Sequence, residues 1–265
     1  MHALKKKYKL KWKNLIKVLT FLGISYAFIS GGIHLFNHLF EYKKTTNILN
    51  EIRKNTTIEY VVDNESTIII DSEDAKDKFS PYFIYIKQGM INLSFNKLKK
   101  KYPDITAWIQ IKNSKINSPI VYSSDTTFYK THTYDKSKNR FGAIYTPNNL
   151  EDESRVTLIK GNKAIFDLRF LYDEKWKDDN ANYLIKFVTP EYTSLWQMVS
   201  VYKDKKEIKT EFTTDEEYTK LLNELIEKSD IDFKTSLNTN DRLLILESTD
   251  NIKLVGKLIK IAYIN

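Results

Sequence analysis

The sequence contains no cysteine, and this absence excludes several kinds of chemistry at once. Disulfide bonds, zinc sites built from thiolates and cysteine nucleophiles all require a thiol side chain. Any nucleophilic role in this chain must therefore fall on another residue type. The absence says little about the redox compartment, because the chain has no thiol to oxidise.

Glycine and proline are also scarce, at 7 and 5 of 265 residues. So few glycines argue against a glycine-rich phosphate loop, and the 42% hydrophobic content is ample for a buried core. We also expect no cofactor and no metal, because no group of candidate ligands has the spacing of a metal site.

The net charge of +8 is concentrated at the start of the chain. Residues 1–17 hold seven lysines and no acidic residue, whereas residues 41–265 hold 35 basic and 34 acidic side chains. The larger part of the chain is therefore nearly neutral and lacks the positive charge that nucleic-acid binding requires. We predict no nucleic-acid partner.

Residues 18–40 are 23 consecutive residues without a formal charge. As a helix they would span roughly 34 Å, enough to cross the hydrocarbon core of a bilayer. Because the lysines precede this run, the positive-inside rule predicts a cytoplasmic segment at 1–17, a transmembrane signal anchor at 18–40 and an extracellular remainder. A cleaved signal peptide is the alternative, but the run is long for one and lacks a clear small-residue exit.

Beyond the anchor, residues 41–79 are interpreted as an extracellular polar helix and stalk, and residues 80–265 as one folded domain. Apolar residues near helical spacing from Phe83 to Leu98 predict a helix that ends before Pro103. Short β-prone segments then follow, with helices predicted at 164–172 and after Thr214. Closely spaced strands with inserted short helices favour a mostly β fold, a closed barrel of about eight strands, over a βαβ sheet.

Six segments, in order along the chain, resemble segments of class B sortases, the cysteine transpeptidases of Gram-positive cell surfaces. Residues 103–111 are similar to that family's Asn-x-Asp-x-x-Gly-Trp-Ile-x-Ile entry to the barrel, and residues 158–162 to its Ile-x-Tyr-Gly-His segment. The other similar segments are residues 116–122, 125–129, 141–145 and 165–168. The resemblance runs from about residue 80 to the end and implies a sortase-like barrel.

The family's catalytic residues do not recur in this chain. Ser248-Thr249-Asp250 stands where the family carries a Leu-Ser-Thr-Cys motif, which an arginine follows. The resemblance implies a cysteine nucleophile, a histidine acid or base and an arginine that stabilises the oxyanion. Those roles fall on Asp250, Asn162 and Lys257 in this sequence, so all three positions are degenerate.

Each replacement removes a chemical capacity. The Asp250 carboxylate is a weak nucleophile towards an amide, and the Asn162 amide cannot transfer a proton at physiological pH. Lys257 keeps a positive charge but lacks the planar fork of arginine. His132 matches a loop outside the catalytic set and is interpreted as a surface residue.

The charges of Asp250 and Lys257 suggest an ion pair across the former cleft. The alternative is that the two charges are solvated independently at a loop, since surface ion pairs contribute only about 0 to 1 kcal/mol.

Three functions remain open from the sequence. The first is an inactive pseudo-transpeptidase in the cell membrane that binds a sorting-signal peptide, an active sortase or a pilin-like surface protein. The second is an active transpeptidase or peptidase with substituted machinery, using Asp250, Lys257, or a hydroxyl of Ser248 or Thr249. The third is a structural protein whose tyrosine- and lysine-rich surface binds the cell envelope.

Overall fold

The computed structural model describes residues 12–63, 65–71, 76, 81–150 and 154–264. The chain divides into two compact units, Met1–Lys43 and Lys44–Asn265. Most of the predicted basic segment, residues 1–11, lies outside the described residues.

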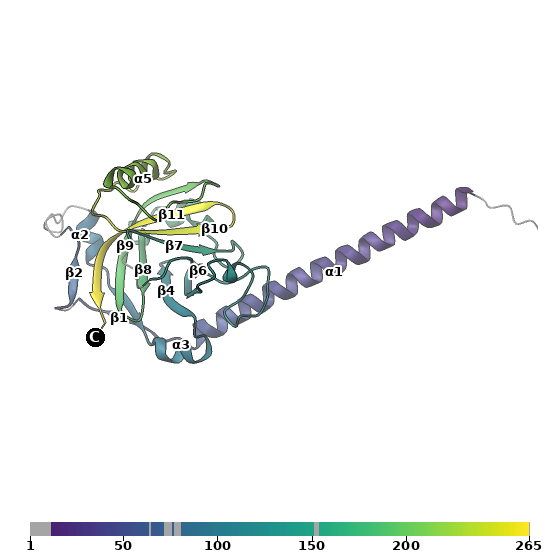
Figure 1. The fold of residues 1–265 in the computed structure, drawn as a ribbon, viewed down its shortest axis with the longest axis horizontal. Helices are drawn as coiled ribbons and strands as arrows, with labels where there is room; N and C mark the ends of the chain where they lie inside the picture. The colour runs from purple at the N-terminus through teal and green to yellow at the C-terminus, as the bar shows by residue number, and fades with distance from the viewer. Residues whose placement is uncertain (1–11, 64, 72–75, 77–80, 151–153, 265) are drawn as a thin grey trace, which may run out of the picture. The chain divides into compact units, whose positions relative to one another are not determined.

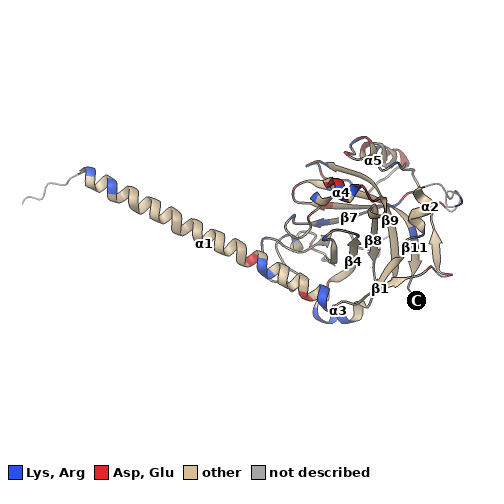
Figure 2. Cartoon of the chain, turned by 180° about the vertical axis from the view of Figure 1, so that it is seen from behind, with Lys and Arg blue, Asp and Glu red and all other residues tan. Residues whose placement is uncertain are grey.

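The predicted apolar run lies within one helix, α1 (Trp12–Lys54), of 43 residues. This helix is long and apolar enough to cross a membrane, and none of its most apolar window is buried in the protein. Figure 2 shows that the charged residues of α1 lie towards its two ends, with a long uncharged stretch between them. Lys13 and Lys17 precede that stretch, as the sequence requires.

The second unit is built on a closed β-barrel, which confirms the predicted fold class (Figure 1). Its nine-stranded sheet has the order β10-β7-β6-β5-β4-β8-β9-β11-β2. Because β10 also pairs with β11, eight of these strands close into a barrel. The ninth strand, β2, pairs with the C-terminal part of β11 and is not part of the closed ring. The strands are β2 (Thr67–Ile69), β4 (Ile105–Ile111), β5 (Asn117–Tyr122), β6 (Tyr145–Thr146), β7 (Val156–Gly161), β8 (Leu184–Val188), β9 (Tyr192–Lys203), β10 (Leu243–Ser248) and β11 (Ile252–Tyr263).

The inserted helices are short except for α5 (Asp215–Glu227). Thr214 caps α5 as predicted, because its side-chain hydroxyl accepts a hydrogen bond from the backbone N–H of Glu217 at 3.2 Å. The helix predicted at 164–172 is reduced to a 3₁₀ turn at its end. The remaining helical segments are α2 (Pro81–Ile86), α3 (Phe95–Lys101), α4 (Glu174–Lys177) and the 3₁₀ turns η2 (Phe128–Lys130), η3 (Arg169–Tyr172) and η4 (Asn180–Asn182).

The single helix predicted from Phe83 to Leu98 is wrong. The structure places α2 and α3 there with a strand between them, β3 (Met90–Leu93), which pairs antiparallel with β1 (Ile58–Val61). A short apolar run fits a strand as well as a buried helix, and here the available pairing partner decides for the strand.

The separate stalk predicted at 41–79 also needs correction. The described residues from 44 to 71 belong to the compact unit: Leu49 and Ile52 of α1 are 3% and 1% exposed, and β2 pairs with β11. These apolar side chains are buried because the barrel offers them a core, which the local sequence does not reveal.

A buried lysine joins this N-terminal part to the barrel. The ammonium Nζ of Lys260, on β11, donates hydrogen bonds to Asp63 Oδ1 at 2.8 Å and to the carbonyl oxygens of Ile86 and Gln88 at 2.6 and 2.8 Å. The side chain is fully buried, so these three acceptors replace the water that its charge loses.

Replacing Lys260 by methionine should therefore lower the free energy of unfolding by about 1 to 3 kcal/mol, because the buried carbonyl of Ile86 and the partly buried carbonyl of Gln88 lose their donor. Thermal unfolding of the full chain in detergent, followed by circular dichroism, measures this effect. Lys205→Met, at an exposed lysine, is the matched control and should change stability little. Equal melting temperatures for the two variants would contradict the proposed role of Lys260.

Candidate functional site

Two of the three expected site positions meet where β7 and β10 end. These strands pair in parallel, and Gly161 at the end of β7 lies opposite Ser248 at the end of β10. The backbone N–H of Thr249 donates to the carbonyl of Gly161 at 3.2 Å, and Thr249 Oγ1 accepts from the N–H of Lys163 at 3.0 Å. Asn162 is thereby held beside the loop that carries Asp250.

Asn162 caps a turn in the position expected for a catalytic histidine. Its side-chain Oδ1 accepts from the N–H of Ala164 at 3.0 Å, and its carbonyl accepts from Phe166 at 2.8 Å. Gly161 permits this turn, because a Cβ added there would lie 2.6 Å from the Cβ of Phe166. The Asn162 oxygen thus has a local structural role.

Asp250 is likewise committed to its own turn. It accepts a hydrogen bond from the hydroxyl of Ser248, two residues earlier. The next residue, Asn251, has a φ of 66°, and its N–H donates to the carbonyl of Ser248 at 2.9 Å. These bonds close a tight link between β10 and β11, and the carboxylate stabilises that link.

Lys257 is not brought to this site, and of the two alternatives left open by the sequence, the ion pair with Asp250 does not form. In the β10–β11 hairpin, Lys257 lies opposite Leu243, at the end of β10 that is farthest from the Asp250 turn. Five residue steps of β11 from Ile252 to Lys257 amount to roughly 17 Å. Lys257 is 7% exposed, and its Nζ donates to the carbonyl of Ser236 at 3.1 Å.

The error came from treating the two residues as neighbours on one hairpin. Both flank the same turn in sequence, but β11 runs away from the turn before it reaches Lys257.

A hollow of about 350 Å³ opens beside Asn162. It is lined by residues in or next to β6, β7 and β10, and in the loops before β6 and after β9, and Asp250 is not among them. Its polar and charged lining includes Lys130, Arg140, Lys160, Asn162, Glu207, Glu247, Ser248 and Thr249. The hollow can therefore make polar contacts with a ligand, while Tyr129, Phe141 and Tyr145 supply aromatic walls.

Lys160 and Glu247 were missed as candidate site residues by the sequence analysis. A signal was present: Glu247 takes the place of the leucine in the family's Leu-Ser-Thr-Cys motif, and Lys160 that of the tyrosine in Ile-x-Tyr-Gly-His. The two replacements lie opposite each other on β7 and β10. Burial raises the pKa of the neighbouring Tyr145 to about 12, with a further contribution from the Glu247 carboxylate.

Arg169 is a second group that sequence reasoning missed. Its guanidinium donates to both carboxylate oxygens of Asp167, at 2.8 and 2.7 Å. The Asp167 carboxylate raises the pKa of Arg169, and Asp250 adds a smaller effect of the same sign. Arg169 is exposed and already paired with Asp167.

The other candidate groups have structural roles. Ser248 is 2% exposed, and its hydroxyl bonds to Asp250, so a substrate carbonyl has poor access to it. His132 stacks on Phe128 with ring centroids 4.0 Å apart and does not line the hollow. Within the described ranges, no group of three or more His, Asp or Glu side chains is arranged to hold a metal ion.

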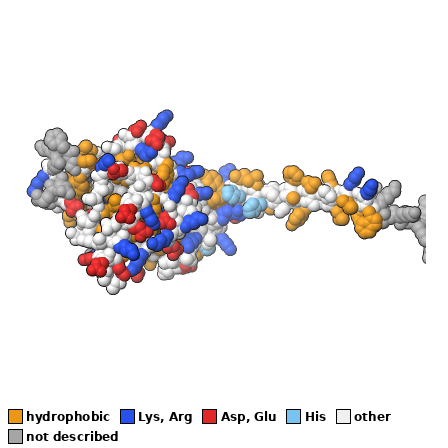
Figure 3. Space-filling view, turned by 90° about the horizontal axis from the view of Figure 1, so that it is seen from above, with side chains coloured by type: hydrophobic (Ala, Val, Ile, Leu, Met, Phe, Trp, Pro, Cys, Tyr) orange, Lys and Arg blue, Asp and Glu red, His pale blue; other side chains and the backbone are white. Residues whose placement is uncertain are grey.

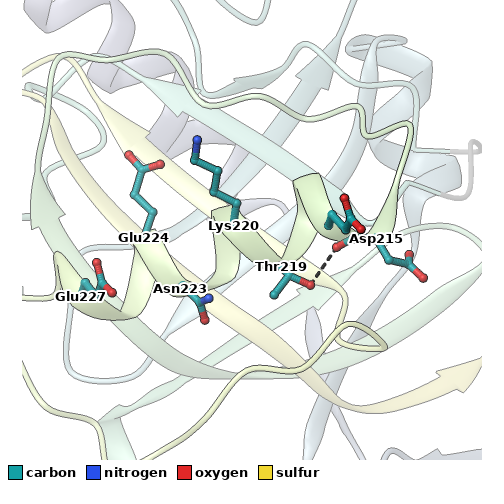
Figure 4. Close-up of a pocket in the computed structure, with 7 residues that line it drawn as sticks. Asp215, Thr219, Lys220, Asn223, Glu224 and Glu227 are labelled. Atoms are coloured by element: carbon teal, nitrogen blue, oxygen red, sulfur yellow. Dashed lines mark hydrogen bonds between the residues drawn. The ribbon is translucent and has the colours of Figure 1, made fainter.

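A larger hollow, of about 690 Å³, lies along α5 and is a less suitable site (Figure 4). All its lining residues project from this one helix, and the Thr219 hydroxyl is used in a 2.8 Å bond to the Asp215 carbonyl. Groups from a single exposed helix face cannot surround a ligand. Figure 3 shows acidic and basic side chains interspersed over the second unit, without one dominant sign on that face.

The closed barrel, with the ends of β7 and β10 meeting beside a hollow, defines a sortase-like fold. No family model matches the chain. It is similar to sortase B of Staphylococcus aureus, 25% identical over 197 residues that cover 66% of this chain and 78% of that protein. It is also similar to sortase B of Listeria monocytogenes, 23% identical over 254 residues that cover 90% and 94%.

Solved structures agree. Sortase B from B. anthracis in complex with AAEK1 superposes with a TM-score of 0.59 at 25% identity, covering 71% of this chain and 97% of that one. A sortase B–substrate complex of Staphylococcus aureus superposes with a TM-score of 0.56 at 24% identity, covering 63% and 84%. The chain is a class B sortase-like protein.

If Asp250 stabilises its turn, removing its hydrogen-bond acceptor should be measurable. Asp250→Ala should lower the free energy of unfolding by about 1 kcal/mol, whereas Asp250→Asn retains an acceptor for the Ser248 hydroxyl and should lose much less. Chemical denaturation of the full chain in detergent compares the variants. Equal stability of Asp250→Ala and the unmodified protein would refute the structural role.

Proposed function

We propose that this chain is a membrane-anchored, extracellular sortase-like protein that binds a sorting-signal peptide without transferring it. The observation that carries the proposal is how the side chains of Asn162 and Asp250 are hydrogen-bonded. These residues occupy the positions expected for the acid or base and for the nucleophile, and both side chains serve as hydrogen-bond acceptors within their own turns.

The chemistry supports inactivity. Transpeptidation by this family needs a thiolate that attacks the threonyl carbonyl, and the chain has no cysteine. The carboxylate at position 250 accepts a hydrogen bond, which further reduces its nucleophilicity. No proton can pass through the Asn162 amide, so a leaving amine could not be protonated from that position.

The hollow beside Asn162 supports peptide binding. It combines aromatic walls with polar groups, the usual composition of a ligand site, and its lining includes Asn162 and Thr249, the residue before Asp250. A relative with the same fold has been solved as a substrate complex. A sortase-like barrel with a hollow beside Asn162, but without the family's reactive groups, is what a binding protein derived from an enzyme would have.

Helix α1 supports the anchoring part of the proposal. It carries a long uncharged stretch with lysines before it, so insertion with the N-terminus in the cytoplasm is favoured. The second unit would then lie outside the cell, where it could meet a sorting-signal peptide, an active sortase or a pilin-like protein. Surface peptides are the partner class that the fold favours.

The full chain in detergent, incubated with synthetic sorting-signal peptides and triglycine as the amine acceptor, should bind peptide and form no product. Mass spectrometry detects product, and saturation-transfer NMR detects binding. Sortase B of Staphylococcus aureus serves as the positive control. Turnover that disappears in Asp250→Ala would overturn the inactive assignment and favour an enzyme with substituted machinery.

Asp250→Cys alone should also form no product, because Asn162 still supplies no proton. Product formation by this single variant would show that the rest of the catalytic site remains competent. Failure of every peptide to bind would instead favour a structural role in the cell envelope.

The topology has its own test. In Gram-positive protoplasts with an intact membrane, added protease should degrade the second unit. The protein should also remain in the membrane fraction after carbonate extraction. A cytoplasmic protein serves as the protection control. Protection of residues 44–265, or release of the protein by carbonate, would contradict the proposed anchor.

A further inference from the structure

A row of polar side chains crosses the barrel wall at the hollow. The strand register places Tyr145 of β6 opposite Lys160 of β7, Lys160 opposite Glu247 of β10, and Glu247 opposite Lys253 of β11. Side chains directly opposite each other on paired strands point to the same face of a sheet. The row therefore brings two lysines to the two sides of one glutamate.

The charges in this row do not cancel. Lys160 Nζ lies 3.6 Å from Glu247 Oε2, and Lys253 Nζ lies 3.7 Å from Glu247 Oε1. Lys253 is fully buried and also donates to the carbonyl of Asp204. One glutamate thus faces two ammonium groups, so the three charged side chains of the row sum to +1, and Lys160 is the lysine among them that lines the hollow.

The Lys160 ammonium can donate hydrogen bonds to a ligand in the hollow. The 3.6 Å contact of its Nζ with Glu247 is longer than a hydrogen bond, and Nζ makes no hydrogen bond to any residue that the structure describes. The side chain is 22% exposed, so its ammonium adjoins the hollow without facing bulk solvent fully. Asn162 adds its side-chain NH₂, because its oxygen alone is used in the turn.

The rest of the lining favours an anion of low charge. Lys130 and Arg140 add two positive charges, whereas Glu207 and Glu247 are the acidic residues among the described lining. Lysine and amide donors suit a carboxylate, and charge-assisted bonds of this kind are stronger than neutral ones. The two glutamates would repel a phosphate dianion more than a carboxylate monoanion.

We propose that this hollow is a carboxylate-binding subsite for a peptide, in which Lys160 donates to a carboxylate oxygen while Glu247 holds the lysine from the opposite side. The inference rests on the proposed peptide-binding function and adds the chemical class that the site recognises. The carboxylate belongs to an acidic side chain or to the free C-terminus of a peptide.

The test compares matched peptides on the full chain in detergent by saturation-transfer NMR titration. Acetyl-Ala-Ala-Ala-Thr with a free carboxylate is compared with its C-terminal amide, and acetyl-Ala-Glu-Ala-Thr-amide with its Gln counterpart. At least one acid should bind roughly tenfold more tightly than its neutral partner. The pair that shows the difference identifies the C-terminus or the side chain as the source.

Two variants test whether Lys160 and Glu247 cause the preference for the acidic peptide. Lys160→Met should abolish the preference for the acid, whereas Lys163→Met, at an exposed lysine that does not line the hollow, should preserve it. Glu247→Gln should increase the preference, since it removes a negative charge beside the ligand. If Lys160→Met does not fold, as judged by circular dichroism, the comparison of acid and amide and the Glu247→Gln result decide.

Three outcomes overturn the proposal. These are equal binding of acid and neutral peptides, an unchanged preference in folded Lys160→Met, and tighter binding of glycerol 3-phosphate than of either acid. Such results with peptide binding intact leave the proposed function standing. Absence of binding by every peptide overturns the proposed function itself and this subsite with it.

Discussion

The parallel pairing of β7 with β10 is the constraint on which the site depends. It brings Gly161 opposite Ser248, although 87 positions separate them in the numbering of the chain. Gly161 is compatible with this arrangement because it leaves room for Phe166, whose Cβ would otherwise clash with a side chain there. The turn at Asn162 and the link at Asp250 both begin where this pairing ends. The barrel therefore sets the positions of both turns, and the hydrogen bonds of Asn162 and Asp250 stabilise each turn locally.

The departures from the sortase pattern form a coherent set in space. Asn162 and Asp250, at the positions proposed for the family's reactive groups, are hydrogen-bond acceptors that stabilise turns. Lys160 lies on β7 two residues before Asn162, and Glu247 lies opposite it on β10. Where the family has a tyrosine and a leucine, this chain has a pair of opposite charges. Introducing one buried charge alone would be costly, but opposite charges on paired strands offset much of that cost. The proposed loss of catalysis and the change in polarity of the hollow thus concern one region of the barrel.

Much of the site could be predicted from the sequence, and the parts that could not be predicted were missed for physical reasons. Absence of cysteine excluded a thiolate mechanism outright, and order-preserving motifs located Asn162 and Asp250. The assignment of Lys257 failed because closeness in sequence across a turn says nothing about distance along the outgoing strand. Lys160 and Glu247 were overlooked because each is an ordinary surface charge in isolation. Only their pairing across two strands distant in sequence gives them a joint role.

The sequence by itself determined the uncharged stretch of α1, the mostly β barrel and the absence of the family's reactive residues, because these follow from composition, local periodicity and residue type. Tertiary structure decided what local patterns leave ambiguous. It made a strand of Met90–Leu93 by giving it β1 as a partner, and it buried Leu49 and Ile52 in the barrel unit. It also separated Lys257 from Asp250 and joined Lys160 to Glu247. Strand pairing and burial are long-range interactions, so no local stretch of sequence specifies them alone.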